Sequence, residues 1–309
     1  MMDLSTKTLR TAFEAVKANQ GCAGVDGVTI AVFEKKLELN LSMLANELNR
    51  NRYTPLPLLK IQVSKKNGEP RGLCIPTVRD RVAQKAVLQS IEPILEKEFE
   101  DCSYAYRKGR SVRQVVYKIR SCYQEGFRWV VDADIDDFFD NVDHHRLLIK
   151  FDEIIGDGNI RSLIRKWVKA DVWDGKQIAM LEKGIPQGSP LSPILANLFL
   201  DELDETFLEK GYKYLRYADD FIVLCKNTDE AEKALALSKE KLEELLLVLD
   251  EEDIVHFDKG FKYLGVMFIK DMALTPFDAP KRIRDVLYYP PPMDIKAYLA
   301  TKKGGAGIG

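Results

Sequence analysis

The segment Lys213-Tyr-Leu-Arg-Tyr-Ala-Asp-Asp-Phe-Ile-Val-Leu-Cys225 carries two adjacent aspartates, Asp219 and Asp220, between two short apolar runs. The aromatic and β-branched residues on both sides predict two strands joined by a tight turn at the aspartates. Adjacent carboxylates at such a turn repel each other unless a proton or a cation relieves the repulsion. A hard divalent cation with oxygen ligands suits this pair, although aspartate is also common in turns that bind nothing.

A second acidic cluster, Asp134-Ile-Asp-Asp-Phe-Phe139, follows another apolar run that includes Phe127 and Trp129. We expect a strand that delivers carboxylates to its end. In phosphoryl transfer, two metal ions about 4 Å apart activate the attacking oxygen and stabilise the leaving one. Such a site needs carboxylates from separate strands, and Asp134 together with the two aspartates of the turn would supply them.

Three further motifs occur along the chain: Arg71-Gly-Leu-Cys-Ile-Pro-Thr-Val-Arg-Asp-Arg81, Cys102-Ser-Tyr-Ala-Tyr-Arg-Lys-Gly-Arg-Ser111 and Gly184-Ile-Pro-Gln-Gly-Ser-Pro-Leu-Ser-Pro193. With the two acidic clusters, they resemble the reverse transcriptases of the bacterial group II intron lineage in order and rough spacing. The resemblance covers residues 20 to 270. Glu252-Asp-Ile-Val-His-Phe257 and the Pro-rich tail are most similar to the CRISPR-associated branch of that lineage.

The resemblance implies an RNA-directed DNA polymerase that adds deoxynucleotides to a primer 3′-hydroxyl. Asp134, Asp219 and Asp220 would be catalytic and would bind two Mg²⁺ ions with the Ile135 carbonyl, and Mn²⁺ could substitute. Four residues would hold the nucleotide: Lys65 and Arg71 at the triphosphate, Phe139 under the sugar and Gln187 beside the nascent base pair. Five would contact template or primer: Arg107, Lys108, Arg110, Gly188 and Tyr217.

Simpler roles for these residues stay open at this point. The hairpin that carries Lys65 and Arg71 could be a solvated charged turn at Asn67-Gly68. The basic residues of the 107–110 loop could be surface charges, and Gln187 could belong to a capping loop. Phe139 could be a core residue, as aromatic side chains usually are, and on a strand only one of Phe138 and Phe139 would face the nucleotide.

The implied fold class is α+β: a right-hand polymerase whose antiparallel palm sheet is backed by helices, with a thumb that is absent or rudimentary. We assign residues 1–90 and 142–188 to the fingers, and residues 91–141 and 189–270 to the palm with the catalytic site. Residues 271–309 are expected to form a short connector, because the Pro run after Tyr289 is stiff and the terminal glycines are flexible. Many members of the lineage carry a Lys-Thr pair where this chain has Glu251 and Glu252, so the acid for the pyrophosphate leaving group is unassigned.

Charge is distributed unevenly along the chain. The formal net charge is −2, yet residues 51–120 carry 15 Lys/Arg against 7 Asp/Glu, which leaves 31 against 41 elsewhere. A basic region beside an acidic one suits a protein that contacts phosphates with one part and metals with the other. The five cysteines form no CxxC pair, and no apolar run approaches a membrane span. We therefore expect a cytoplasmic protein without a membrane partner.

The expected partners are an RNA or DNA template with its primer, deoxynucleoside triphosphates, and a CRISPR integrase or another domain after the connector. Two alternatives from other classes remain. The first is a catalytically quiet nucleic-acid-binding subunit of a defence or mobile-element complex, against which the intact acidic motifs argue. The second is a nucleotidyltransferase that needs no template.

Overall fold

The palm sheet is an antiparallel sheet of four strands in the order β6-β7-β3-β8. Its strands are β6 (Lys213–Tyr217), β7 (Asp220–Cys225), β3 (Trp129–Ile135) and β8 (Leu249–His256). The computed structural model describes residues 4–64, 70–274 and 286–304. Strands β6 and β7 form the hairpin predicted from the apolar runs around the two aspartates, since Tyr217 pairs with Asp220 across a two-residue turn.

The two faces of the palm sheet are covered differently, as strand periodicity requires. Val131 and Val223 face the main core, where helices α9 (Ser192–Glu209) and α10 (Thr228–Glu244) cover the sheet. Val130, Ile222 and Leu224 face helix α5 (Val112–Gln124) and a small antiparallel sheet. That small sheet contains β9 (Phe261–Tyr263), β10 (Val266–Ile269) and β11 (Met272–Leu274).

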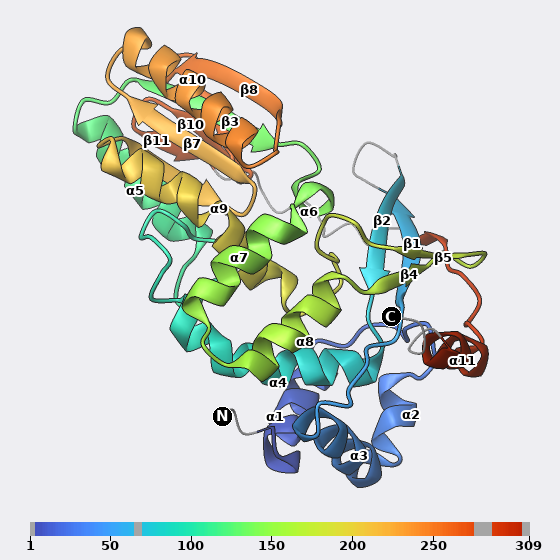
Figure 1. Cartoon of the computed structure of the whole chain (residues 1–309). Helices are drawn as coiled ribbons and strands as arrows, with labels where there is room; N and C mark the ends of the chain where they lie inside the picture. The colour runs from blue at the N-terminus through green and yellow to red at the C-terminus, as the bar shows by residue number, and fades with distance from the viewer. Residues whose placement is uncertain (1–3, 65–69, 275–285, 305–309) are drawn as a thin grey trace.

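The fingers sheet is built around β1 (Leu58–Ser64), which pairs antiparallel with β2 (Pro70–Ile75). Strand β4 (Asp171–Trp173) pairs parallel with β1 and antiparallel with β5 (Ile178–Met180). The predicted hairpin is therefore present, but Lys65 and its Asn67-Gly68 turn lie outside the described residues. The helices of this lobe extend from the middle of the molecule to the end opposite the palm sheet (Figure 1). They are α1 (Thr6–Ala18), α2 (Ile30–Glu34), α3 (Leu37–Asn49), α4 (Val78–Leu95), α7 (His144–Ile154) and α8 (Gly158–Val168).

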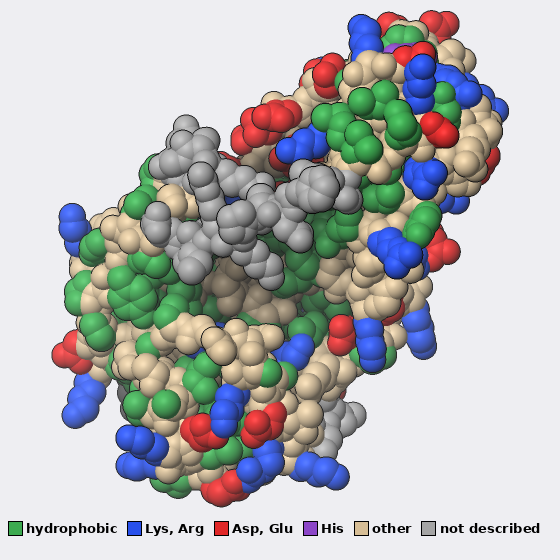
Figure 2. All heavy atoms as spheres, turned by 180° about the vertical axis from the view of Figure 1, so that it is seen from behind, with side chains coloured by type: hydrophobic (Ala, Val, Ile, Leu, Met, Phe, Trp, Pro, Cys, Tyr) green, Lys and Arg blue, Asp and Glu red, His purple; other side chains and the backbone are tan. Residues whose placement is uncertain are grey.

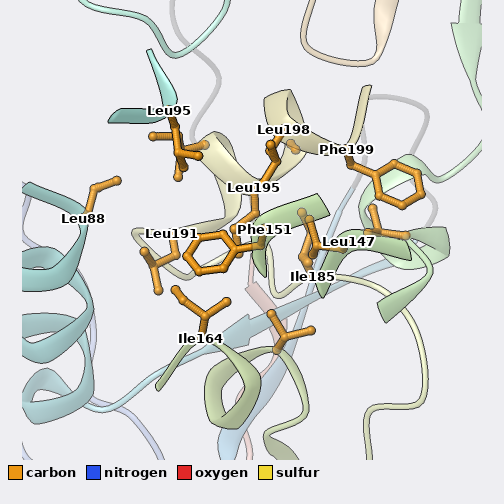
Figure 3. Close-up of a cluster of buried hydrophobic side chains, with 14 of the residues drawn as sticks. Leu88, Leu95, Leu147, Phe151, Ile164, Ile185, Leu191, Leu195, Leu198 and Phe199 are labelled. Atoms are coloured by element: carbon orange, nitrogen blue, oxygen red, sulfur yellow. The ribbon is translucent and has the colours of Figure 1, made fainter. Parts of the chain in front are cut away.

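One hydrophobic core joins the lobes and fixes their arrangement. Side chains from α4, α7 and α9 converge in it, including Leu95, Phe151 and Leu195 (Figure 3). Helices α4 and α7 begin at side-chain caps: Thr77 accepts from the Asp80 N–H, and Asp143 accepts from the Arg146 N–H. Viewed from behind, the lobes meet at a hollow whose visible walls are largely hydrophobic or uncharged surface (Figure 2).

The expected connector is partly folded. Residues 286–288 form β12, which pairs antiparallel with β1, and α11 (Ile295–Gly304) follows. Met293 and Tyr298 are buried in an apolar cluster with Val25 and Leu59. The Tyr298 hydroxyl also donates to the buried Asp171 carboxylate at 2.8 Å. These residues are therefore packed on the fingers and are not a free linker, because the apolar side chains between the prolines and the glycines find a buried site there.

The prediction of a mixed α and β fold with an antiparallel sheet backed by helices is confirmed. The division into fingers and palm by residue number stays a prediction. In the described part of the chain, no helix is both long and apolar enough to cross a membrane.

Candidate functional site

The predicted catalytic aspartates meet at one end of the palm sheet. Asp134, near the end of β3, is the direct cross-strand partner of Asp220 at the start of β7. Because side chains alternate along a strand, both project from the face that also carries Asp132. Asp219 lies in the β6–β7 turn beside Ala218, whose φ is 64°. The structure thus brings together carboxylates that lie more than eighty residues apart in sequence.

Burial raises the pKa of all four aspartates in this cluster, and repulsion between them adds to the rise at Asp132, Asp134 and Asp220. Burial raises the pKa of Asp220 to about 8, and the neighbouring Asp132, Asp134 and Asp219 contribute further. Burial and then Asp219 raise the pKa of Asp134 to about 6. The pKa of Asp132 also rises to about 6, through burial and then Asp253. Burial raises the pKa of Asp219, whereas Arg71 and Arg216 oppose that rise.

A pocket of about 420 Å³ is lined by Asp132, Asp134 and Asp220, whereas Asp219 is not among its lining residues. Strand β8 contributes further acidic side chains to it, and Lys262 contributes a cation. Oxygen donors that repel one another are the ligand set that a hard divalent cation stabilises, so the residues fit the predicted Mg²⁺. Among the described residues, however, no three Asp, Glu, His or Cys side chains already converge on one point.

The predicted backbone ligand, Ile135, lies at a register shift between β3 and β8. There Asp134 pairs with Glu251 while Ile135 pairs with Leu249, so Asp250 has no partner on β3. The Ile135 N–H donates to Asp134 Oδ1 at 3.0 Å. This bond orients the Asp134 carboxylate, and the role of the Ile135 carbonyl stays a prediction.

We expect the stability of the metal-free chain to fall as pH rises from about 5 to 8. The pKa of Asp220 is about 8 in the folded chain against an ordinary 3.8, so the folded state binds its proton more tightly than the unfolded state. The resulting destabilisation begins above the unfolded pKa and is complete above the folded pKa. Melting temperatures measured in EDTA across this range should show the fall. Mg²⁺ should offset it at pH 8, and Asp220→Asn should flatten the profile; a profile equally steep in that variant would contradict the assignment.

Three of the predicted nucleotide-binding residues gather near the catalytic strand. Burial raises the pKa of Asp140, while Arg71 and a hydrogen bond from Gln187 lower it. Arg71 and Gln187 therefore lie close to the Phe139–Asp140 turn. The Arg71 Nε is buried and has no hydrogen-bond partner within the described chain, so its guanidinium retains donor capacity.

Phe139 does not lie on a strand. The expectation that strand alternation would turn only one of Phe138 and Phe139 toward the nucleotide therefore does not apply. Strand β3 ends at Ile135, and the chain turns through Asp137, whose φ is 36°. Phe138 and Phe139 then begin the short helix α6 (Phe138–Asn141). Phe138 is 1% exposed and packs on Phe199, whereas Phe139 is 9% exposed. Both are core residues, and of the two Phe139 is the more accessible.

Gly188 has a packing role in the structure. A Cβ at this position would lie 2.6 Å from the Cys74 carbonyl oxygen of β2. Only glycine allows the 186–189 loop to approach the fingers sheet this closely. The predicted contact of Gly188 with template or primer stays a prediction.

Arg107 is used within the protein and does not support the predicted template contact. The residue is 8% exposed, and its guanidinium donates to the Phe99 and Ser103 carbonyl oxygens at 3.1 and 2.9 Å. It also pairs with Glu96. The sequence shows only a basic residue in a loop. It does not show that this side chain turns inward and donates to the carbonyl groups after α4.

The other predicted template and primer residues remain accessible. Lys108 is exposed, and Arg110 pairs with Asp101 while lying 5.6 Å from the Tyr104 ring centroid. Tyr217 is half-buried and projects from the sheet face that carries the carboxylates, because it pairs with Asp220. Their contacts with nucleic acid stay predictions.

The sequence argument missed four residues. Asp132 lies two residues before Asp134 and so shares its face. Tyr106 is 52% exposed with a φ of 64°, and Asp219 contributes to its raised pKa after burial. Arg216 and Asp204 form a buried ion pair beneath the catalytic turn. Two signals were available in the sequence: the two-residue spacing of Asp132 and Asp134, and an arginine between the aromatic and aliphatic residues of β6.

Comparison with known proteins gives matches over most of the chain. A model of the family "Reverse transcriptase (RNA-dependent DNA polymerase)" matches residues 63–268. Protein YkfC of Escherichia coli is 32% identical over 80% of this chain and 76% of its own length. The group II intron-encoded protein LtrA of Lactococcus lactis is 34% identical over 68% of this chain, but this chain spans only 35% of LtrA.

Solved structures also match most of this chain. A telomerase from Candida tropicalis in complex with a telomeric RNA fragment matches with a TM-score of 0.59 over 82% of this chain and 50% of its own, at 12% identity. This likeness concerns the fold alone. A chain of a partial Cas6-RT-Cas1–Cas2 complex is 30% identical over 78% of this chain and 40% of its own, with a TM-score of 0.48.

Proposed function

This chain belongs to the reverse transcriptase (RNA-dependent DNA polymerase) family, in its group II intron-like lineage, and on that premise we propose that it extends a primer 3′-hydroxyl by two-metal phosphoryl transfer. The observation that carries the proposal is the cross-strand pairing of Asp134 with Asp220, with Asp219 in the adjoining turn. Cross-strand pairing brings the two carboxylates within the reach of a shared cation.

Asp134, Asp219 and Asp220 are the residues that would hold the two divalent ions. Bound there, these ions lower the pKa of the primer hydroxyl and stabilise charge on the triphosphate. Arg71, with its unpartnered Nε, would hold the triphosphate through forked donors. Gln187 would contact the nascent base pair with a side chain that both donates and accepts.

Primer extension on defined templates tests this function. The chain would be given Mg²⁺, deoxynucleotides and a labelled primer on RNA and DNA templates of differing sequence. Products whose sequence follows the template support templated synthesis. Products that grow without regard to the template indicate the template-independent alternative, and template binding without extension indicates a catalytically quiet subunit.

Sugar choice gives a sharper prediction. Phe139 would lie under the nucleotide sugar, so that a 2′-hydroxyl would collide with its ring. Phe139→Val should raise ribonucleotide incorporation by at least about tenfold, a change of about 1.4 kcal/mol in the discriminating step. Incorporation of deoxynucleotides should fall much less. Single-nucleotide incorporation with each substrate measures both values.

Phe138→Val is the matched control, because Phe138 is buried against Phe199 on α9. This variant should lower the melting temperature and leave the sugar preference unchanged. If instead Phe138→Val relaxes the preference and Phe139→Val only destabilises the fold, the ring under the sugar is not Phe139.

We also propose that the chain works beside a CRISPR spacer integrase and supplies DNA copied from RNA. The supporting observation is the resemblance of Glu252-Asp-Ile-Val-His-Phe257 to the CRISPR-associated branch. Size-exclusion chromatography of the purified chain with a Cas1–Cas2 integrase tests the association. Separate elution at micromolar concentrations would count against it.

A further inference from the structure

Arg216 is a buried cation at the end of strand β6, one residue before Tyr217 and two before the catalytic turn. It is 1% exposed, and its partner Asp204 on α9 is fully buried. Arg216 pairs with Phe221 across the hairpin, so its side chain projects to the α9 face of the palm sheet. The guanidinium therefore lies on the face opposite to the catalytic carboxylates.

Each donor of this guanidinium has a partner. Nε and Nη2 donate to the two Asp204 carboxylate oxygens at 2.7 and 2.5 Å. Nη1 donates to Asn197 Oδ1 at 3.0 Å, and Nη2 donates to Ser103 Oγ at 2.9 Å. The remaining bond runs from Nη1 to the Ala218 carbonyl oxygen at 2.9 Å. An arginine has five N–H donors, so this network uses them fully.

The bond to Ala218 connects the network to the catalytic turn. Ala218 has a φ of 64° although it is not a glycine, a conformation that costs about 1–2 kcal/mol for a residue with a Cβ. Its peptide group leads directly into Asp219. A fixed donor on the Ala218 carbonyl therefore restrains the turn that carries Asp219.

Stability alone does not account for this ion pair. A buried pair has a large desolvation cost, and replacing it with well-packed apolar residues is often neutral or stabilising. Residue 216 also joins segments that are distant in sequence through its backbone: the Arg216 N–H donates to the Cys102 carbonyl, and the Tyr104 N–H donates to the Arg216 carbonyl. The 102–110 segment, which carries Tyr106 and Arg110, is thereby placed relative to the turn.

We propose that Arg216, oriented by Asp204, Asn197 and Ser103, is a positioning residue that fixes the Ala218–Asp219 turn so that its carboxylate can share a divalent cation with Asp134 and Asp220. This inference rests on the proposed function for its catalytic consequence, but its structural part concerns the metal-free chain. Lysine cannot replace arginine here, because one ammonium group cannot bind both Asp204 oxygens and three further acceptors in a fixed plane.

The test uses Arg216→Lys and the apolar double variant Arg216→Met/Asp204→Leu. Tyr53→Phe is the matched control, because Tyr53 is buried in the fingers core and donates to Asp80 at 2.5 Å without contact to the turn. For each protein, Mn²⁺ affinity is measured by electron paramagnetic resonance without substrate, together with the melting temperature. Primer extension then gives kcat and the KM for deoxynucleotide.

We expect both Arg216 variants to bind Mn²⁺ at least tenfold more weakly than the parent chain, and to lose about a hundredfold in kcat with KM changed by less than threefold. Tyr53→Phe should have a lower melting temperature, while its Mn²⁺ affinity and kcat stay at the parental values. Parental Mn²⁺ affinity in a folded Arg216 variant, or equal losses in Tyr53→Phe, would overturn the proposal. If the double variant does not fold, Arg216→Lys decides the question. If the parent chain binds Mn²⁺ but extends no primer, the proposed function fails while the affinity comparison still tests Arg216.

Discussion

Asp219→Asn should reduce primer extension by about a thousandfold while leaving the fold intact. The substitution removes the charge of a metal ligand without changing the volume of the side chain. Loss of one such ligand costs several kcal/mol of transition-state stabilisation, and about 4 kcal/mol corresponds to three orders of magnitude in rate. The melting temperature should stay level or rise, because the substitution removes one of the repelling carboxylates around Asp220.

Extension and melting temperature should be measured on the same preparations. Asp258→Asn serves as the control, since Asp258 is an exposed carboxylate after β8 and lies outside the β6–β7 turn and the end of β3. It should extend primers at the parental rate. Residual activity above a few per cent in Asp219→Asn, or a loss that follows unfolding, would show that Asp219 is not a metal ligand.

Gly184→Ala should lower the free energy of unfolding by about 3 kcal/mol. Gly184 has a φ of 87°, and a Cβ there would lie 2.8 and 2.9 Å from the Asp140 and Phe139 carbonyl oxygens. The strain of a left-handed alanine and the overlap with backbone atoms each cost about 1–3 kcal/mol. The Gly184 N–H donates to the Val142 carbonyl at 2.7 Å, and the Ile185 N–H donates to that of Phe139. The overlap must therefore move the backbone that carries Phe139.

Urea denaturation measures this effect. Gly156→Ala is the matched control, because Gly156 has ordinary backbone angles and no atom within 4 Å of a Cβ built on it. That substitution should be neutral or slightly stabilising, since it reduces the entropy of the unfolded chain. Gly184→Ala should also alter sugar discrimination as Phe139 moves. Equal stability of the two variants would show that the 184–185 loop adjusts without strain.

The local parts of the fold could be predicted from sequence because their signals are local. Apolar runs on both sides of Asp219 and Asp220 defined the hairpin, and the run before Asp134 defined a strand. The pairing of Asp134 with Asp220 is a long-range register. The chemistry of a two-metal site and the resemblance to a family implied that these carboxylates converge, but no local signal gave the register. The additional carboxylate, Asp132, follows from that register and from strand periodicity, so it could have been found once Asp134 was placed.

The errors have one physical cause, which is tertiary context. Phe138 and Phe139 were placed on a strand because nothing in their sequence shows that Asp137 adopts a left-handed conformation and ends it. Arg107 is a basic residue in a loop, as a phosphate contact would be, yet its guanidinium donates to the carbonyl groups after α4. Residues 286–304 have the composition of a linker, yet Met293 and Tyr298 fill an apolar site on the fingers.

The pairing of β12 with β1 has a consequence for how the molecule is assembled. It joins Gln62 to Tyr288, so it closes a loop that contains the whole palm sheet. Contacts of such separation are slow to form, because the entropy of loop closure is lost before the contact is gained. During synthesis the palm strands emerge before β12, so the fingers sheet is completed last.

Val286 and Leu287 stay more than half exposed, so little apolar burial holds this strand in place. Strand β12 should therefore separate from β1 without opening of the palm sheet. The amide hydrogens of β12 should exchange with solvent before those of β3 and β7.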